Sequence, residues 1–102
     1  MNQLIAAHKS EIAALCLRHS VARLDVFGSA ASGAFDPDSS DLDFLVEFDD
    51  LEPVAYKRAY FGLLWGLEDL FARPIDLVTK QSLKNPYFVQ NVYDTRELVY
   101  GG

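Results

Sequence analysis

Several features that mark secreted, membrane and nucleic-acid-binding proteins are scarce in this sequence of 102 residues. Cys16 is the single cysteine, so no internal disulfide can form, which favours a reducing environment. No apolar run reaches the ~20 residues that a membrane helix needs. His8, Lys9 and Glu11 interrupt the N-terminal segment, where a signal peptide would be continuously apolar. We therefore expect a cytoplasmic protein without membrane contact.

Basic residues are also few, with 9 Lys and Arg against 15 Asp and Glu, which gives a net charge of −6. Proteins that bind polynucleotides non-specifically rely on a basic surface. We therefore expect no polynucleotide binding by the chain itself, whereas a small nucleotide or a partner with a basic surface is compatible with its charge. The sequence contains no repeat, low-complexity tract or linker. Residues 1–102 are expected to form a single domain.

Apolar periodicity divides the chain into strands and helices. We predict strands over Val21–Phe27, Asp41–Phe48 and Ile75–Thr79, helices over Asn2–His19, Val54–Phe71 and Pro86–Val99, and short turns or helices over Ala30–Gly33 and Lys80–Asn85. This set of elements predicts an α+β fold, a small mixed and twisted β-sheet with helices packed on one side.

Two carboxylates stand at the start of the second predicted strand. Asp41 and Asp43 are two residues apart, so their side chains point to the same face, with Cα atoms about 6.5–7 Å apart. Two anions on one face of an apolar strand repel each other and are costly to desolvate. A hard cation such as magnesium or manganese relieves both costs. The spacing therefore predicts a metal site at these two residues.

Other polar residues belong with this pair. Gly28 and Ser29 end the first predicted strand, where backbone N–H groups and a hydroxyl can contact a phosphate. Asp76 lies in the third predicted strand and either joins the two acids or faces solvent alone. An unpaired charge in a buried strand is costly, which favours convergence. A metal site next to a phosphate-binding turn is typical of enzymes that transfer phosphoryl or nucleotidyl groups.

In this order, the residues resemble the nucleotidyltransferase superfamily that includes DNA polymerase β, and the short chain resembles its minimal nucleotidyltransferase (MNT) domains. The resemblance covers roughly residues 25–79 and implies a polymerase β palm-like fold. It implies Mg²⁺ (or Mn²⁺) as cofactor and ATP as substrate. The family pattern places catalysis and metal binding at Asp41, Asp43 and Asp76, and nucleotide binding at Gly28, Ser29, Gly33 and Ser40.

The reaction that this resemblance implies is transfer of a nucleoside monophosphate, AMP from ATP, to a hydroxyl group of a partner protein. Asp76 would take the proton from that hydroxyl. Larger relatives carry a second domain that presents the acceptor, so here another molecule is expected to bring it. In the family, minimal domains are often antitoxins of HEPN ribonuclease toxins, some of which they adenylylate. The implied partner is therefore a HEPN-type toxin, with a homo-oligomer as the alternative.

One position departs from the family pattern. Ser32 stands where the family commonly has an arginine, in G-S-x-A-R-G, that helps to position the triphosphate. This departure keeps two other functions open, a non-catalytic module that neutralises a partner by occlusion and a regulator that senses ATP. The three acids favour the enzyme, because unpaired carboxylates have no evident structural use.

Two large aromatic residues lie outside the main apolar face of the helix predicted over Val54–Phe71. Phe61 and Trp65 either form a partner surface or are covered by a terminal helix of the same chain. Gly62 and Gly66, on the neighbouring flank, permit the close approach of another backbone.

The N-terminal helix carries the remaining residues with reactive side chains. Cys16 has no evident basic neighbour that would lower its pKa, so we assign it to the core. His8 and His19 are three turns apart, too far to share a metal, and are assigned to packing or boundary positions.

Overall fold

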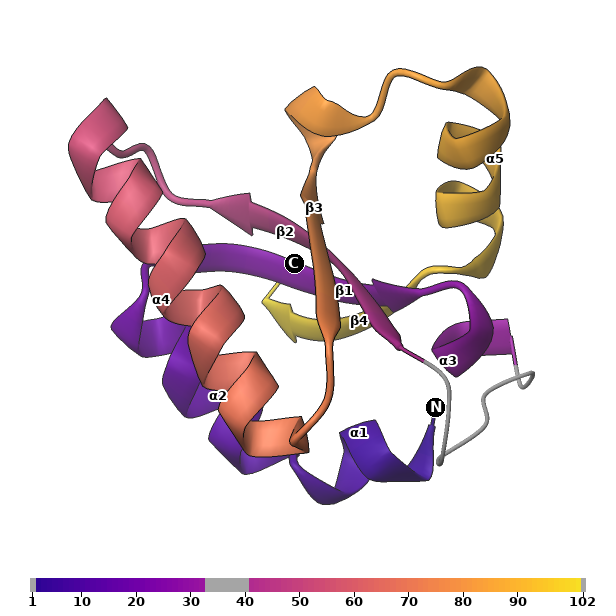
Figure 1. The fold of residues 1–102 in the computed structure, drawn as a ribbon, viewed down its shortest axis with the longest axis horizontal. Coiled ribbons are helices and arrows are strands. Elements are labelled where there is room, and N and C mark those ends of the chain that lie inside the picture. Colours follow the sequence, from indigo (N-terminus) through magenta and orange to yellow (C-terminus); the bar gives the residue numbers. More distant parts are fainter. Residues whose placement is uncertain (1, 33–40, 102) are drawn as a thin grey trace.

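The protein is built on a four-stranded mixed sheet, seen in a computed structural model that describes residues 2–32 and 41–101 (Figure 1). The strands are β1 Val21–Phe27, β2 Leu42–Phe48, β3 Ile75–Thr79 and β4 Glu97–Gly101. They lie in the order β3-β2-β1-β4, with β1 antiparallel to β2 and β4, and β2 parallel to β3. A parallel pair requires a crossover connection, which helix α4, Pro53–Phe71, provides.

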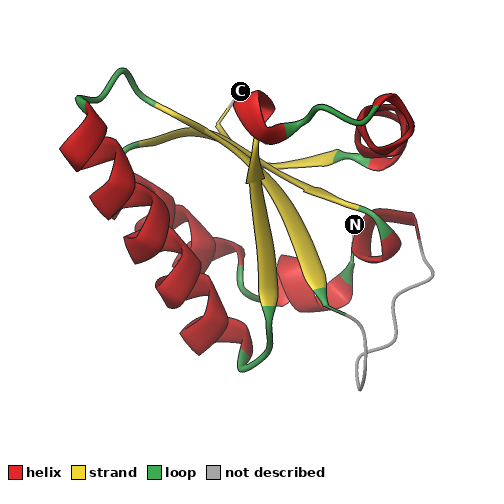
Figure 2. Ribbon diagram, turned by 45° about the horizontal axis from the view of Figure 1, so that its top comes forward, coloured by secondary structure: helices red, strands yellow, loops and turns green. Residues whose placement is uncertain are grey.

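Three helices cover one face of the sheet (Figure 2). These are α1 Gln3–Ala7, α2 Lys9–Arg18 and α4, which has its proline in the first turn, where no N–H is needed. The core between helices and sheet is apolar, and its buried members include Ile5, Ile12, Cys16, Leu24, Val26, Phe44, Val46, Leu63, Leu67, Phe71 and Leu77.

The opposite face of the sheet is covered in part by α5, Pro86–Thr95 (Figures 1 and 2). Val92 of α5 packs with Phe27 of β1 and Leu45 of β2 in a second, smaller cluster. The two short elements are α3, Ser29–Ser32, and the 3-10 helix η1, Lys80–Ser82. The predicted α+β fold is therefore confirmed, with α1, α2 and α4 on the expected side and α5 on the other.

The N-terminal segment is two helices, and the prediction of one helix over Asn2–His19 was wrong at its middle. The chain leaves helical geometry at His8, where φ is −114° and ψ is 18°. The Nδ1 atom of His8 lies 2.9 Å from the carbonyl oxygen of Leu4, and its backbone N–H donates to Ile5 instead. The side chain thus takes the acceptor that a continuous helix would use, which breaks the ladder.

The C-terminal segment was also predicted incorrectly as one helix over Pro86–Val99. It is α5 followed by β4, and the extended Arg96 lies between them. Glu97–Gly101 pairs with β1, whose other side would otherwise be an open sheet edge. A five-residue strand carries too little periodicity to be separated from a preceding helix by pattern alone.

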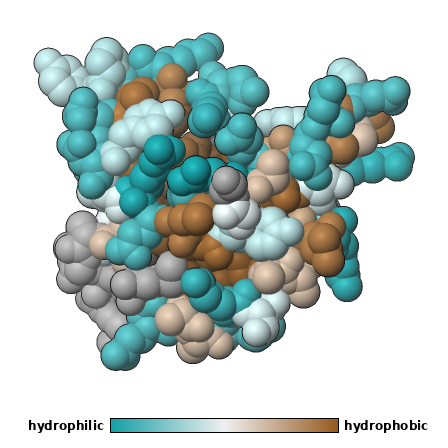
Figure 3. Space-filling model, turned by 180° about the vertical axis from the view of Figure 1, so that it is seen from behind, coloured by the Kyte–Doolittle hydropathy of each residue, from teal (hydrophilic) through white to brown (hydrophobic). Residues whose placement is uncertain are grey.

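The surface is mixed in polarity. On the face shown in Figure 3, apolar residues gather near the middle, with hydrophilic residues around them. No helix in the described residues is long and apolar enough to span a membrane.

Candidate active site

Asp43 and Asp76 are neighbours across two parallel strands. Asp43 of β2 pairs in register with Asp76 of β3 and, on its other side, with Phe27 of β1. Residues paired in register on adjacent strands lie about 5 Å apart and point to the same face. Asp76 therefore lies beside Asp43 as one alternative predicted, and it is also exposed to solvent on that face, as the other predicted.

Asp41 immediately precedes β2 and is exposed, so the strand begins one residue later than predicted. Burial, then the charge of Asp76, then that of Asp41 raise the pKa of Asp43 from 3.8 to about 6. Both neighbouring carboxylates therefore act on Asp43, as the sequence predicted. The charged form of Asp43 is therefore disfavoured beside these two acids, a cost that a cation would relieve.

This cost predicts a dependence of stability on pH. Burial and then the two neighbouring charges raise the pKa of Asp43 to about 6 in the folded chain, whereas it lies near 3.8 in the unfolded chain, so between these values the unfolded chain loses its proton first. Raising the pH from about 4 to about 6 should therefore lower the free energy of unfolding of the metal-free protein. Asp43→Asn removes the cost and should stabilise it by about 1–2 kcal/mol at pH 7, allowing for solvent screening.

Urea denaturation of both proteins at pH 4 and pH 7, with a chelator present, measures this effect. Asp50→Asn is the matched control, because Asp50 is exposed beyond the far end of β2. If the free energies of unfolding of Asp43→Asn and of the original chain differ by the same amount at pH 4 and pH 7, the charge on Asp43 does not destabilise the fold.

Gly28 leaves the space into which the Asp43 carboxylate extends. Its φ of +70° favours glycine, and a Cβ atom built there would lie 2.6 Å from Asp43 Oδ2. Any side chain at this position would push the carboxylate away. The predicted site residue thus has a steric role that its position in a Gly-Ser turn did not reveal.

The backbone N–H of Gly28 is already engaged. It donates to Thr95 Oγ1 at 2.9 Å, and the Thr95 hydroxyl donates to the carbonyl of Asn91 at 2.8 Å. The C-terminal end of α5 therefore holds the turn that ends β1. Thr95 was not among the predicted site residues, because no local pattern marks a hydroxyl that acts 67 residues away from its partner.

The structure describes some of the other predicted nucleotide-binding residues and not others. Ser29 begins α3, next to Gly28, and Ser32 ends this helix. Gly33 and Ser40 lie outside the described residues. The assignment of phosphate binding to these four positions therefore stays a prediction.

The donor set suits a hard cation. Within residues 2–32 and 41–101, no three His, Cys, Asp or Glu side chains are close enough to hold a metal ion unaided. Magnesium does not need such a cage, because it commonly binds one or two carboxylates together with substrate phosphates and water. The adjacent Asp43 and Asp76, with Asp41 at the strand entrance and the space left by Gly28, meet that requirement.

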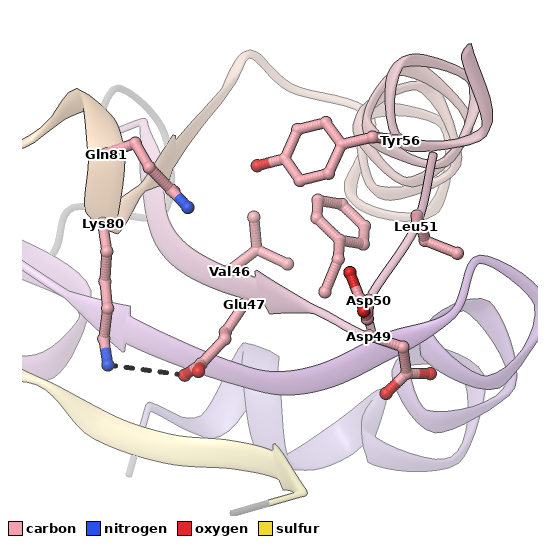
Figure 4. A pocket seen from close by; sticks show the side chains of 9 residues that line it. Val46, Glu47, Asp49, Asp50, Leu51, Tyr56, Lys80 and Gln81 are labelled. Carbon is pink, nitrogen blue, oxygen red and sulfur yellow. Dashed lines mark ion pairs between the residues drawn. The ribbon is translucent and has the colours of Figure 1, made fainter. Parts of the chain in front are cut away.

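A cavity of about 330 Å³ lies at the other end of β2 (Figure 4). Tyr56 and Leu51 line it from the α4 side, and Lys80 of η1 forms an ion pair of 3.5 Å with Glu47 at its edge. The lining on β2 begins at Val46, towards the C-terminal end of the strand, whereas Asp41 and Asp43 stand at its N-terminal end. The cavity is therefore distinct from the carboxylate site.

Asp25 is the one buried charged residue in the described part of the chain. Arg23 Nε donates to both of its carboxylate oxygens, at 3.2 and 3.1 Å, and Arg96 Nη1 lies 3.9 Å away. These cations offset the cost of burying the carboxylate, and Arg96 thereby ties the α5–β4 connection to β1. The aspartate within the apolar stretch VARLDVF is the sequence signal for this buried charge, and it was not among the predicted site residues.

The reactive side chains of α2 and its ends take part in packing, as predicted. Cys16 is buried, which raises the pKa of its thiol to about 12 and leaves it unreactive. The His8 ring lies 5.3 Å from that of Phe71, and His19 lies against Gly62 of α4.

A mixed sheet that presents neighbouring carboxylates next to a Gly-Ser turn is compatible with nucleotidyl transfer, an argument that rests on the site and not on the fold. The sequence matches the nucleotidyltransferase domain family over residues 9–99. The chain belongs to this family and is a nucleotidyltransferase of the minimal type.

Similar sequences occur in Methanocaldococcus jannaschii. One protein named as a protein adenylyltransferase is 32% identical over 83 residues, which cover 81% of this chain and 79% of that protein. Another of the same name is 28% identical over 100 residues, with coverage of 98% and 93%.

Solved structures share the fold. A minimal nucleotidyltransferase is 29% identical, with a TM-score of 0.67 and 95% of both chains covered. A toxin-antitoxin complex with AMP-PNP gives a TM-score of 0.68 at 23% identity, covering 92% of this chain and 73% of the other. A tri-AMPylated HEPN toxin of Shewanella oneidensis in complex with an MNT antitoxin gives 0.64 at 20% identity, covering 96% and 73%.

Proposed function

We propose that this nucleotidyltransferase moves AMP from ATP onto a hydroxyl group of a partner protein, and that it is the antitoxin of a HEPN/MNT pair. The observation that carries the catalytic part is the register of Asp43 against Asp76, with Asp41 at the strand entrance. The names of the M. jannaschii relatives support the choice of AMP and of a protein acceptor. The shared fold with MNT antitoxins supports the choice of partner.

The acids have distinct roles in this proposal. Asp41 and Asp43 would hold magnesium or manganese, with Asp76 contributing from β3. When bound, the metal supplies positive charge that neutralises the triphosphate and the leaving pyrophosphate. Asp76 accepts the proton of the attacking hydroxyl. The hydroxyl oxygen forms a bond to the α-phosphorus, the bond from that phosphorus to the bridging oxygen breaks, and pyrophosphate leaves with the electron pair.

The Gly-Ser turn positions the substrate. The N–H of Gly28 is engaged by Thr95, so we assign to Gly28 the space beside the carboxylate and to Ser29 the contact with the β- and γ-phosphates. Gly33 and Ser40 would complete this contact. The turn ends a central strand and is held by the hydrogen bond from Gly28 to Thr95, which favours orientation of the reacting groups.

Transfer of label from ATP tests the proposal. The protein is incubated with a purified HEPN-type protein from the same genome, magnesium, and ATP labelled on the α- or the γ-phosphate. The α-label should become covalently bound to the HEPN protein, the γ-label should not, and excess chelator should stop the transfer. Incorporation of the γ-label would indicate phosphorylation, and transfer that continues in chelator would contradict the metal site.

A second function stays possible because Ser32 stands where the family commonly has an arginine. A chain that no longer transfers AMP could still neutralise its partner by occlusion. If the chain acts by occlusion, Asp41→Asn and Asp43→Asn would still neutralise the partner. If it acts by AMP transfer, both variants would fail to neutralise it.

A further inference from the structure

The outward side of α4 is organised as an apolar stripe between two charged flanks. At about 100° per residue, seven positions fall within an arc of about 120° that is separate from the side facing the core. In order around the helix they are Lys57, Glu68, Phe61, Val54, Trp65, Arg58 and Asp69. The three apolar residues occupy the centre of this arc, and each flank carries one cation and one anion.

The apolar stripe is uncovered. Val54 is 65% exposed, Phe61 37% and Trp65 61%, so the alternative that a terminal helix covers the aromatic residues is excluded for the described chain. The Phe61 and Trp65 rings lie together, with centroids 5.6 Å apart. They line a groove of about 680 Å³ with Val54, Lys57 and Arg58. Clustered aromatic residues of this kind mark an interaction site.

Helix α2 limits where a partner can bind. Its residue Leu15 lies against Gly66, and His19, just beyond its end, lies against Gly62, since Cβ atoms there would be 2.6 and 2.5 Å away. The glycines thus serve the close packing of α2 on α4, within this chain. On α4, the stripe and its two flanks remain available to another molecule.

The four flanking charges have no partner within the described part of the chain. Lys57, Arg58, Glu68 and Asp69 take part in no ion pair there. The cations lie in the N-terminal half of α4 and the anions in its C-terminal half. Such a pattern is complementary to itself when the helix direction is reversed.

We propose that the outer face of α4 is the interface of a homodimer, in which α4 packs antiparallel to α4 of a second copy about a twofold axis at the level of Leu63. Phe61 is two residues before Leu63 and Trp65 two residues after it, so each Phe61 meets the partner copy's tryptophan at position 65. The aromatic part of the stripe, Phe61 and Trp65, of one copy then covers the same part of the other, and Val54 lies beyond this contact.

The charges pair on both flanks in this arrangement. The axis lies in the interface and perpendicular to both helices, so it brings the same flank of each copy together. Lys57 is six residues before the axis and Glu68 five after it, and both lie on one flank. On the other flank Arg58 is five residues before and Asp69 six after. Each pair differs in level by one residue, about 1.5 Å, within reach of these side chains.

The opposite orientation is disfavoured by the same charges. In a parallel pair, Lys57 of one copy would stand beside Arg58 of the other, and Glu68 beside Asp69. Like charges at an interface cost free energy and suppress that pairing. A partner of a different sequence would have to reproduce this order of charges, whereas a second copy has it by symmetry.

Sedimentation velocity and Trp65 emission over about 1–500 µM measure the association. Trp65 is the only tryptophan, so its emission should shift to shorter wavelength in the same range in which the dimer forms. Phe61→Ser should raise the dimer dissociation constant at least about tenfold, and Tyr87→Ala should not, although Tyr87 is 88% exposed on α5. A wild-type chain that is monomeric throughout, or Phe61→Ser that dimerises normally, would overturn the proposal.

A charge exchange tests the antiparallel register. Chain one carries Lys57→Glu and Arg58→Glu, and chain two carries Glu68→Lys and Asp69→Lys. Each alone should be monomeric, because like charges then meet on both flanks. Their equimolar mixture should dimerise, since every pair across the interface is again of opposite sign. All four sites are on the helix surface, and circular dichroism checks that both chains fold.

Failure of the mixture to dimerise, with both chains folded and the wild type dimeric, would overturn the antiparallel register. The inference is independent of nucleotide transfer, because the α4 face lies on the other side of the sheet from Asp43 and Asp76.

Discussion

Asp43→Asn is expected to lower AMP transfer by at least about a thousandfold. The side chain is half-buried, stands directly opposite Asp76 and is the acid whose pKa responds to both neighbours. An amide carries no negative charge and offers one neutral carbonyl oxygen, whereas a hard cation prefers the anionic carboxylate. Loss of about 4 kcal/mol of charge stabilisation in the transition state corresponds to this factor. Initial rates with α-labelled ATP measure the effect.

Asp41→Asn should have a similar effect on transfer, and Asp50→Asn should have none. Both control and test positions are exposed acids flanking β2, so general effects of charge cancel in the comparison. The Asp43→Asn protein should unfold at a higher urea concentration than the original at pH 7, which excludes misfolding as the cause of lost activity. Transfer at more than a tenth of the original rate would place the metal elsewhere.

Asp76→Asn is expected to reduce kcat by about 10²–10⁴-fold while changing the affinity for ATP much less. A general base contributes mainly in the transition state, and its removal typically has this magnitude. Asp76 is exposed, beside Asp43 in the parallel strand, where an acceptor hydroxyl can reach it from solvent. Single-turnover rates and calorimetric titration with ATP and magnesium separate the two quantities.

A carbon-detected titration of the Asp43 carboxyl gives a second readout for the same variant. Asp76 is a cause of the raised pKa of Asp43, so Asp76→Asn should bring that pKa down from about 6 towards 3.8. A wild-type rate in the variant would exclude Asp76 as the base. An unchanged Asp43 titration would show that the two carboxylates do not interact.

The sequence by itself determined most elements and the identity of the acids. Strands β1 and β3 and helix α4 follow from strong local patterns, such as Pro53 before a long apolar periodicity and the alternation in Ile75–Thr79. The two-residue spacing of Asp41 and Asp43 predicted their shared face, since strand geometry has a period of two. Those features depend on residues close together in the chain, which is why they could be predicted.

The tertiary structure alone decided how distant residues meet. The pairing of Asp43 with Asp76 depends on the parallel register of β2 and β3, which α4 sets across 26 residues between Phe48 and Ile75. The contact of Gly28 with the Asp43 carboxylate and the hydrogen bond from Gly28 to Thr95 likewise join segments that no local pattern relates.

Strand β4 and the break at His8 were missed for different physical reasons. Glu97–Gly101 becomes a strand because β1 offers it an unpaired edge, and the break forms where the His8 ring meets both the Leu4 carbonyl and Phe71 of α4. For β4, contacts made after folding outweigh the local preference of the chain. The break at His8 begins with a contact inside the same segment, to the Leu4 carbonyl, and only the contact with Phe71 depends on the folded arrangement.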